Sequence, residues 1–179
     1  MLRKLIFITI LTALLPLGAV FAGETAISQK PIIKNGMIIF AAYLGPEHTA
    51  MAPMLPGMAR AADIHLETDL YASKHNKQGL EPGTWIPYLA ITYHLSKQGS
   101  DWATAGPSVP MVASDGLHYG NNVKLDGPGK YTLTLHIEPP PYAGFSRHTD
   151  KEIGVAPWWE PFSVSWTFDW PGNGESSHR

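Results

Sequence analysis

Apolar and polar residues alternate with a period of two in three segments of this chain, as they do in strands with one buried face. The alternation is clearest in residues 63–71 and recurs in residues 130–138 and 162–170. In the first segment the polar positions include His65 and Glu67. The pattern therefore predicts three β-strands, each with one apolar and one polar face.

Two further segments are apolar enough to be strands inside the protein. Residues 37–44 form a continuous apolar run, which is typical of a strand buried on both faces. Residues 85–95 have the composition of another strand, whose start Pro87 displaces to an edge or a bulge. The chain holds 17 Gly and 16 Pro, which suits short strands joined by turns. We therefore predict an all-β fold, specifically an immunoglobulin-like β-sandwich.

The start of the chain has the pattern of a secretory signal peptide: a basic beginning, a short apolar run, and small residues at the −3 and −1 positions of a cleavage site. These features fall at Arg3 and Lys4, at residues 5–15, and at Val20 and Ala22. The apolar run is too short to span a membrane comfortably. We predict a cleaved signal peptide at residues 1–22 and a single immunoglobulin-like domain at residues 23–179, with a polar tail at residues 172–179.

Composition and charge exclude several kinds of chemistry. A formal net charge of −2 with no basic run argues against nucleic acid and against an anionic membrane surface as partners. Without cysteine the chain has no disulfide framework, no lipid-anchor cysteine and no thiolate nucleophile. The hydrolase, nucleotide-binding and zinc-protease motifs are also absent from the sequence. We expect a binding protein and not an enzyme, with an oxidase activity left open.

His65 and Glu67 are the first candidate metal ligands. Residues i and i+2 of a strand project from the same face, so an imidazole and a carboxylate stand side by side there. Taken alone, this common pair is more simply explained as an ordinary solvated strand face. Met111 and His118 flank a turn at residues 114–116 that brings their side chains toward one point. A methionine in this position is also a common way to fill a core.

Further candidates lie outside these two segments. His136 is on the polar face of its strand, where it is a ligand, a hydrogen-bond partner of a ligand, or a surface residue. His148 lies in a loop next to Asp150, as a ligand or as part of a solvated ion-pair cluster. The Pro-interrupted segment 51–58 holds three methionines and suits a soft-metal entry route. The remaining histidines have no partner in the sequence and are taken as surface residues: His75, His94 and His178.

Several long motifs occur in the order and spacing of one known family, over about residues 33–170. They are Asp63-Ile64-His65-Leu66-Glu67, Trp85-Ile86-Pro87-Tyr88-Leu89, Pro110-Met111-Val112-Ala113-Ser114-Asp115-Gly116, His118-Tyr119-Gly120-Asn121-Asn122, His136-Ile137-Glu138-Pro139-Pro140 and Gly144-Phe145-Ser146-Arg147-His148-Thr149-Asp150-Lys151-Glu152. In these motifs the chain resembles the periplasmic iron-transport protein family. The resemblance implies an immunoglobulin-like, copper-binding homodimer in the periplasm that works beside an inner-membrane iron permease.

The resemblance also assigns site residues. It implies copper ligands at His65, Met111, His118 and His148, with Glu67 as an adjacent carboxylate that joins the site or holds a second ion. Asp115 and His136 are further candidates, either for a second metal site or for contacts to the ligands. The resemblance places the site near the interface of the implied dimer. It leaves open whether His148 comes from the same subunit or from the partner subunit. Leu117 departs from the family, which usually has proline there.

The leading hypothesis is a periplasmic copper- and iron-binding protein for high-affinity iron uptake. A set of imidazoles and one thioether without thiolate holds Cu(I) as well as Cu(II), and Glu67 adds an oxygen that favours Cu(II) or iron. A copper-dependent iron oxidase or reductase is the alternative from the enzyme class. Copper storage or tolerance, using the methionines of residues 51–58, is the third hypothesis.

Overall fold

The computed structural model describes residues 23–173, so the predicted signal peptide and most of the predicted polar tail lie outside the described residues. The elements of this part are strands and two short 3₁₀ helices. In chain order they are β1 (Thr25–Ala26), β2 (Ile32–Lys34), β3 (Met37–Leu44), η1 (Pro46–His48), β4 (Ile64–Ala72), β5 (Ala90–Lys97), β6 (Ala103–Ala113), β7 (Gly116–Val123), β8 (Gly129–Glu138), η2 (Pro140–Ala143) and β9 (Phe162–Trp170). No helix in this part of the chain is long and apolar enough to cross a membrane.

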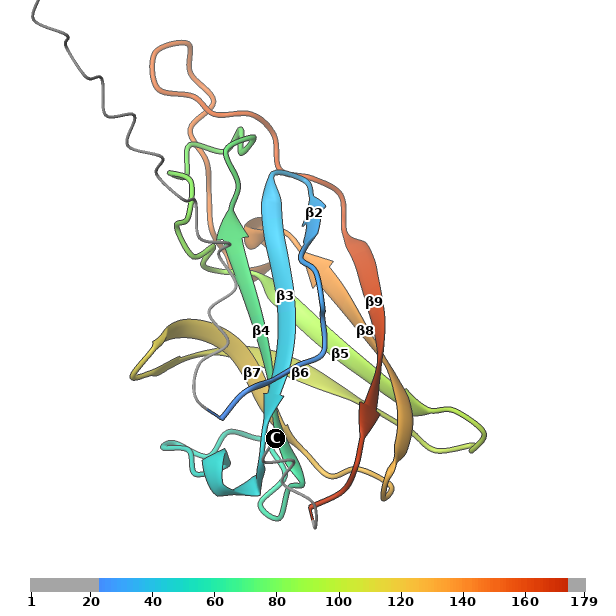
Figure 1. Ribbon diagram of the computed structural model, residues 1–179. Helices are drawn as coiled ribbons and strands as arrows, with labels where there is room; N and C mark the ends of the chain where they lie inside the picture. The colour runs from blue at the N-terminus through green and yellow to red at the C-terminus, as the bar shows by residue number, and fades with distance from the viewer. Residues whose placement is uncertain (1–22, 174–179) are drawn as a thin grey trace, which may run out of the picture.

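The strands form one antiparallel sheet in the order β1-β3-β4-β7-β6-β5-β8-β9, with β2 added to β3. The sheet curls so that β3 and β4 lie in front of β5, with β8 and β9 to the right of them in this view (Figure 1). Strand β6 belongs to both halves, because its residues 103–108 pair with β5 and its residues 109–113 pair with β7. Pro107 and Pro110 flank the point where β6 changes partner. A proline cannot donate a ladder hydrogen bond, so this is where the sheet can bend most easily.

The core fills the space between the two halves. Leu66 and Leu70 of β4 are fully buried, as are Leu133 and Leu135 of β8. Tyr43 of β3 meets Phe168 of β9 with ring centroids 5.7 Å apart. Burying one such side chain stabilises the fold by about 1.5–3 kcal/mol. The alternating residues of the sequence are therefore the ones that hold the two halves together.

The predicted strands at residues 63–71, 130–138 and 162–170 are confirmed as β4, β8 and β9. The all-β prediction is also confirmed, as a curled antiparallel sheet, and the immunoglobulin-like assignment stays a prediction.

Two details of the predictions were wrong. The apolar run at residues 37–44 is buried on one face and only half-buried on the other, because only the first face meets the core. The strand predicted from residue 85 begins at Ala90. Trp85 makes only an isolated bridge to Tyr71, and Tyr88 has a positive φ of 60°, which no strand residue adopts.

Candidate metal centre

His65 and Glu67 lie on the face of β4 that points away from the core. Strand β7 pairs with β4 so that Asn122 stands opposite His65 and Gly120 stands opposite Glu67. Directly paired residues of an antiparallel ladder share a face, so all four positions lie on the same side of the sheet. The sequence pattern predicted this grouping for His65 and Glu67.

The outer face of β4 and β7 is nevertheless covered, by the segment of residues 45–63 that joins β3 to β4. Asn122 Nδ2 donates to the carbonyl oxygen of Thr49 at 2.7 Å, and Ala59 N donates to the carbonyl oxygen of Asn122 at 3.2 Å. Under this cover His65 is only 2% exposed. An outward-facing histidine is therefore removed from water by a connection between strands and not by the core.

The hydrogen bonds of His65 leave one ring nitrogen free. Its Nδ1 lies 2.8 Å from Asn122 Oδ1, and since the amide nitrogen of Asn122 already donates to Thr49, Oδ1 is the acceptor of this bond. Nδ1 therefore carries the proton and Nε2 has an unshared lone pair. His65 Nε2 is buried and has no hydrogen-bond partner among residues 23–173. A side chain at Gly120 would place its Cβ 2.7 Å from this nitrogen, so glycine keeps the space in front of it open.

His118 brings a second imidazole to the same place. It lies on β7, its ring centroid is 5.7 Å from that of His65 in an edge-to-face arrangement, and its Nδ1 is 3.1 Å from Glu67 Oε1. Both Glu67 and His118 are buried, at 5% and 4% exposure. Met111 is paired with His118 across β6 and β7, so the thioether stands on the same face beside the second imidazole. Four of the predicted ligands thus gather on one surface of the sheet.

Burial controls the protonation of this group. Together with the negative charges of Asp69, Glu24 and Asp115, burial raises the pKa of Glu67 to about 8, and burial is the largest of these causes. Near pH 7 Glu67 therefore keeps its proton while no cation is nearby. A bound cation would favour the carboxylate, because it supplies the positive charge that burial takes away.

The two imidazoles are held in their neutral form. Burial lowers the pKa of His118 to about 4, and the charge of His65 lowers it as well. Burial is also the main cause that lowers the pKa of His65. The contact of 3.1 Å between Glu67 and His118 therefore joins two neutral groups near pH 7, although its distance would also fit an ion pair. Neutral imidazole is the form that binds metals.

A small acid-lined cavity of about 20 Å³ adjoins His118. Its lining comes from the N-terminal segment, β4 and the β6–β7 hairpin, and most of its side chains carry oxygen. The lining residues are Glu24, Glu67, Asp69, Tyr71, Asp115, Gly116, Leu117 and His118. Burial raises the pKa of Asp69 to about 6. The structure thus brings Asp115 to the same cavity as Glu67, where the sequence analysis placed oxygen ligands.

His148 and His136 are not part of this group within one chain. His148 lies in the loop between η2 and β9, where its side chain is 72% exposed and its Nδ1 is 3.6 Å from Asp150 Oδ2. This loop bonds to the segment after the end of β4, through Ala156 N and Lys77 O. His65 is the second residue of β4, at the opposite end of that strand. At about 3.3 Å per residue, His65 is about 23 Å from the end of β4 at Ala72. His136 lies on β8, in the other half of the sheet.

The donor set fits a copper-type ion. It consists of the free Nε2 of His65, the neutral His118, the adjacent thioether of Met111 and the carboxyl group of Glu67. These groups do not form a complete coordination shell within one chain. Within residues 23–173, no three His, Asp or Glu side chains already converge closely enough to hold an ion.

Sequence reasoning missed Asn122 and Gly120, which orient His65 and make room for it. The available signal was their period of two with His118, which puts all three on one face of the same strand.

Comparisons with known proteins point to one family. A family model described as Fe2+ transport protein matches residues 21–172. A UPF0423 protein of Brucella abortus is 45% identical over 150 residues, which cover 82% of this chain and 81% of that protein.

Two solved structures are similar over most of the chain. FetP of uropathogenic Escherichia coli, expressed in the periplasm, is 46% identical with a TM-score of 0.77, covering 83% of this chain and 97% of that one. The P19 protein of Campylobacter jejuni, reconstituted with copper, is 41% identical with a TM-score of 0.78, covering 86% of this chain and 99% of that one.

Proposed function

This chain belongs to the Fe2+ transport protein family, and on that premise we propose that it is a periplasmic copper-binding protein that supports high-affinity iron uptake beside an inner-membrane iron permease. The observation that carries the copper site is the buried Nε2 of His65, which has no hydrogen-bond partner within residues 23–173 and lies on the same sheet face as His118 and Glu67. The copper bound by the P19 protein of Campylobacter jejuni supports the choice of metal.

Each side chain of the centre has a distinct role in this proposal. His65 and His118 supply neutral imidazole nitrogens, and Met111 supplies a soft sulfur. This neutral set accommodates both Cu(I) and Cu(II), so the bound metal would supply one-electron redox chemistry. Glu67, released from its proton by the cation, supplies a hard oxygen. Asp115 extends the oxygen donors toward the adjoining cavity.

We also propose a homodimer in which His148 of the partner subunit completes the centre. Support comes from the position of His148 in an exposed loop at the opposite end of β4 from His65, too far to bind the same ion within one chain. The signal peptide at residues 1–22, the single domain at residues 23–179 and the immunoglobulin-like classification belong to the same proposal.

Oxidation or reduction of iron at this centre is a second candidate function. The acid-lined cavity favours it, because Glu67 and Asp115 would hold an iron ion through oxygen next to a copper ligand, His118. Catalytic turnover of Fe2+ by the copper-loaded protein separates this candidate from a binding role.

Removal of the two imidazoles tests the centre. We expect His65→Ala and His118→Ala to lower copper affinity by more than about 100-fold each, beyond the usual effect of losing a group that only contacts a ligand. His75→Ala removes an exposed histidine and serves as the matched control. Competition titration with copper chelators measures the affinity, and unchanged affinity in both variants would refute the assignment. A deletion strain that grows poorly in low iron, but normally in high copper, supports iron uptake over copper tolerance.

A further inference from the structure

The outer face of the other half of the sheet carries two exposed imidazoles side by side. His94 lies on β5 and His136 lies on β8, and both are exposed. We propose that these two side chains form a second, solvent-exposed site that binds one divalent transition-metal ion of the Cu²⁺, Ni²⁺ or Zn²⁺ class. This site is separate from the candidate centre and does not depend on it.

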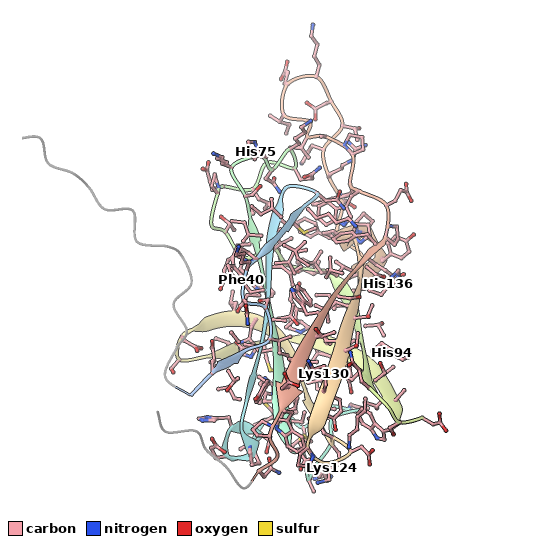
Figure 2. All side chains as sticks on the ribbon, turned by 45° about the vertical axis from the view of Figure 1, so that its right-hand side comes forward. Phe40, His75, His94, Lys124, Lys130 and His136 are labelled. Atoms are coloured by element: carbon pink, nitrogen blue, oxygen red, sulfur yellow. The ribbon has the colours of Figure 1, made fainter. Side chains whose placement is uncertain are left out.

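Register places the two rings within reach of one ion. Thr134 stands opposite His94, and Thr92 stands opposite His136, so the four residues share one face and the two histidines are diagonal neighbours. Diagonal Cβ atoms in a sheet are about 7–8 Å apart or slightly less. An imidazole nitrogen binds such metals at about 2.0–2.1 Å, so an ion between the two rings can contact both. Figure 2 shows His136 and His94 one above the other along these strands.

A hydrogen bond from the neighbouring strand orients one of the rings. His136 Nδ1 lies 3.2 Å from Ser163 Oγ, and Ser163 is the residue of β9 paired with His136. With Nδ1 held by β9, Nε2 is the ring nitrogen left to bind an ion. Anchoring of one ring nitrogen by a hydrogen bond is the usual arrangement of metal-binding histidines.

The surroundings leave both rings accessible. Along the same face the neighbouring positions are hydroxyl residues or small residues, and Glu138 lies two residues beyond His136 on β8, on the side away from His94. The hydroxyl groups and water can complete the coordination of a bound ion. Copper should bind most tightly, since affinities for imidazole sites rise toward Cu²⁺ in the first-row series.

The test uses the purified full-length protein titrated with Cu²⁺, and separately with Zn²⁺, by equilibrium dialysis. We expect His94→Ala/His136→Ala to lose one bound equivalent that the wild type, His75→Ala and the candidate-centre variant His65→Ala all retain. Each single substitution should lower affinity at this site by about 10-fold or more, and the double substitution should add little, because two-point binding is already lost. Ser163→Ala should lower affinity by up to about 10-fold.

A second test uses only the wild-type protein, so it does not depend on whether the variants fold. In NMR spectra the ring signals of His94 and His136 should broaden together when Cu²⁺ is added, while the His75 ring signal stays sharp. Simultaneous broadening of the two rings with loss of one equivalent in the double variant supports the site. An unchanged stoichiometry in the double variant, or two independent and additive losses in the single variants, would overturn it.

Discussion

The same short motif occurs once in each half of the sheet, with opposite surroundings. His65-Leu66-Glu67 lies on β4 under the segment of residues 45–63, and its imidazole and carboxyl groups are almost fully buried. His136-Ile137-Glu138 lies on β8 with no such cover, and its imidazole is exposed. Burial shifts the protonation of the first pair and fixes its partners, whereas the second pair stays in contact with water. The pattern His-x-Glu therefore gives the direction of the side chains, and the connecting segment decides their chemistry.

Filling the space at Gly120 should have the largest effect on the covered half. In Gly120→Ala the new Cβ would lie 2.7 Å from His65 Nε2 and 2.9 Å from the backbone oxygen of Leu66, which cannot move aside easily. We expect a loss of about 1–3 kcal/mol in the free energy of unfolding and displacement of the His65 ring from its ligand position. Chemical denaturation and copper titration measure the two effects.

The matched control for Gly120→Ala is Thr134→Ala, on the outer face of the uncovered half, which should change stability by less than about 0.5 kcal/mol. Equal effects of the two substitutions would contradict the difference between the halves.

Removing Asn122 should have the next largest effect, because its side chain contacts both His65 and the covering segment. Asn122→Ala loses the acceptor that fixes the His65 ring and the donor to the Thr49 carbonyl. Copper affinity should fall by about 10–100-fold, and amide exchange within residues 45–63 should become faster. Ser163→Ala, the equivalent change beside His136, should leave copper binding at the candidate centre unaltered. Copper affinity equal to wild type would show that Asn122 does not orient His65.

Met111→Leu sharpens the comparison by removing only the soft ligand. The substitution keeps the apolar volume, so the metal-free protein should lose less than about 1.5 kcal/mol of stability. Cu(I) affinity should fall far more than Cu(II) affinity, since sulfur favours the softer ion. Competition titrations with Cu(I) and Cu(II) chelators decide this, and an unchanged Cu(I) affinity would show that Met111 only fills space.

Protonation of Glu67 should be visible in the pH dependence of stability. The pKa of Glu67 is raised from 4.5 to about 8 in the folded metal-free protein. Its stabilising contribution is therefore present below pH 4.5 and is lost as the pH rises through about 8. Glu67→Gln, which stays neutral, should unfold at a higher temperature than the wild type at pH 8.5 and at a similar temperature at pH 4.5. Thermal unfolding of metal-free protein measures this, and a constant difference at both pH values would contradict it.

The sequence was sufficient for three of the strands and for the faces of the site residues. Period-two alternation located β4, β8 and β9, and the turn at residues 114–116 located the β6–β7 hairpin that pairs Met111 with His118. These features depend on residues close together in the chain. The cover over His65 could not be predicted, because it depends on hydrogen bonds between Thr49 and Asn122, far apart in sequence.

The surroundings of the remaining histidines were equally hidden from the sequence. His94 was taken as an isolated surface residue because only the β5–β8 register places it beside His136. The position of His148 relative to the centre depends on the proposed second subunit, which no local pattern describes.

Strand β6 has a consequence for how the protein folds. Its first residues are paired with β5 and its last residues with β7, so neither half of the sheet keeps a complete set of strand neighbours without the other. Separate melting of the two halves would break the ladder in the middle of a strand. The described part of the chain should therefore unfold in one cooperative transition, and the slowest amide hydrogens of β4 and β8 should exchange with the same opening free energy.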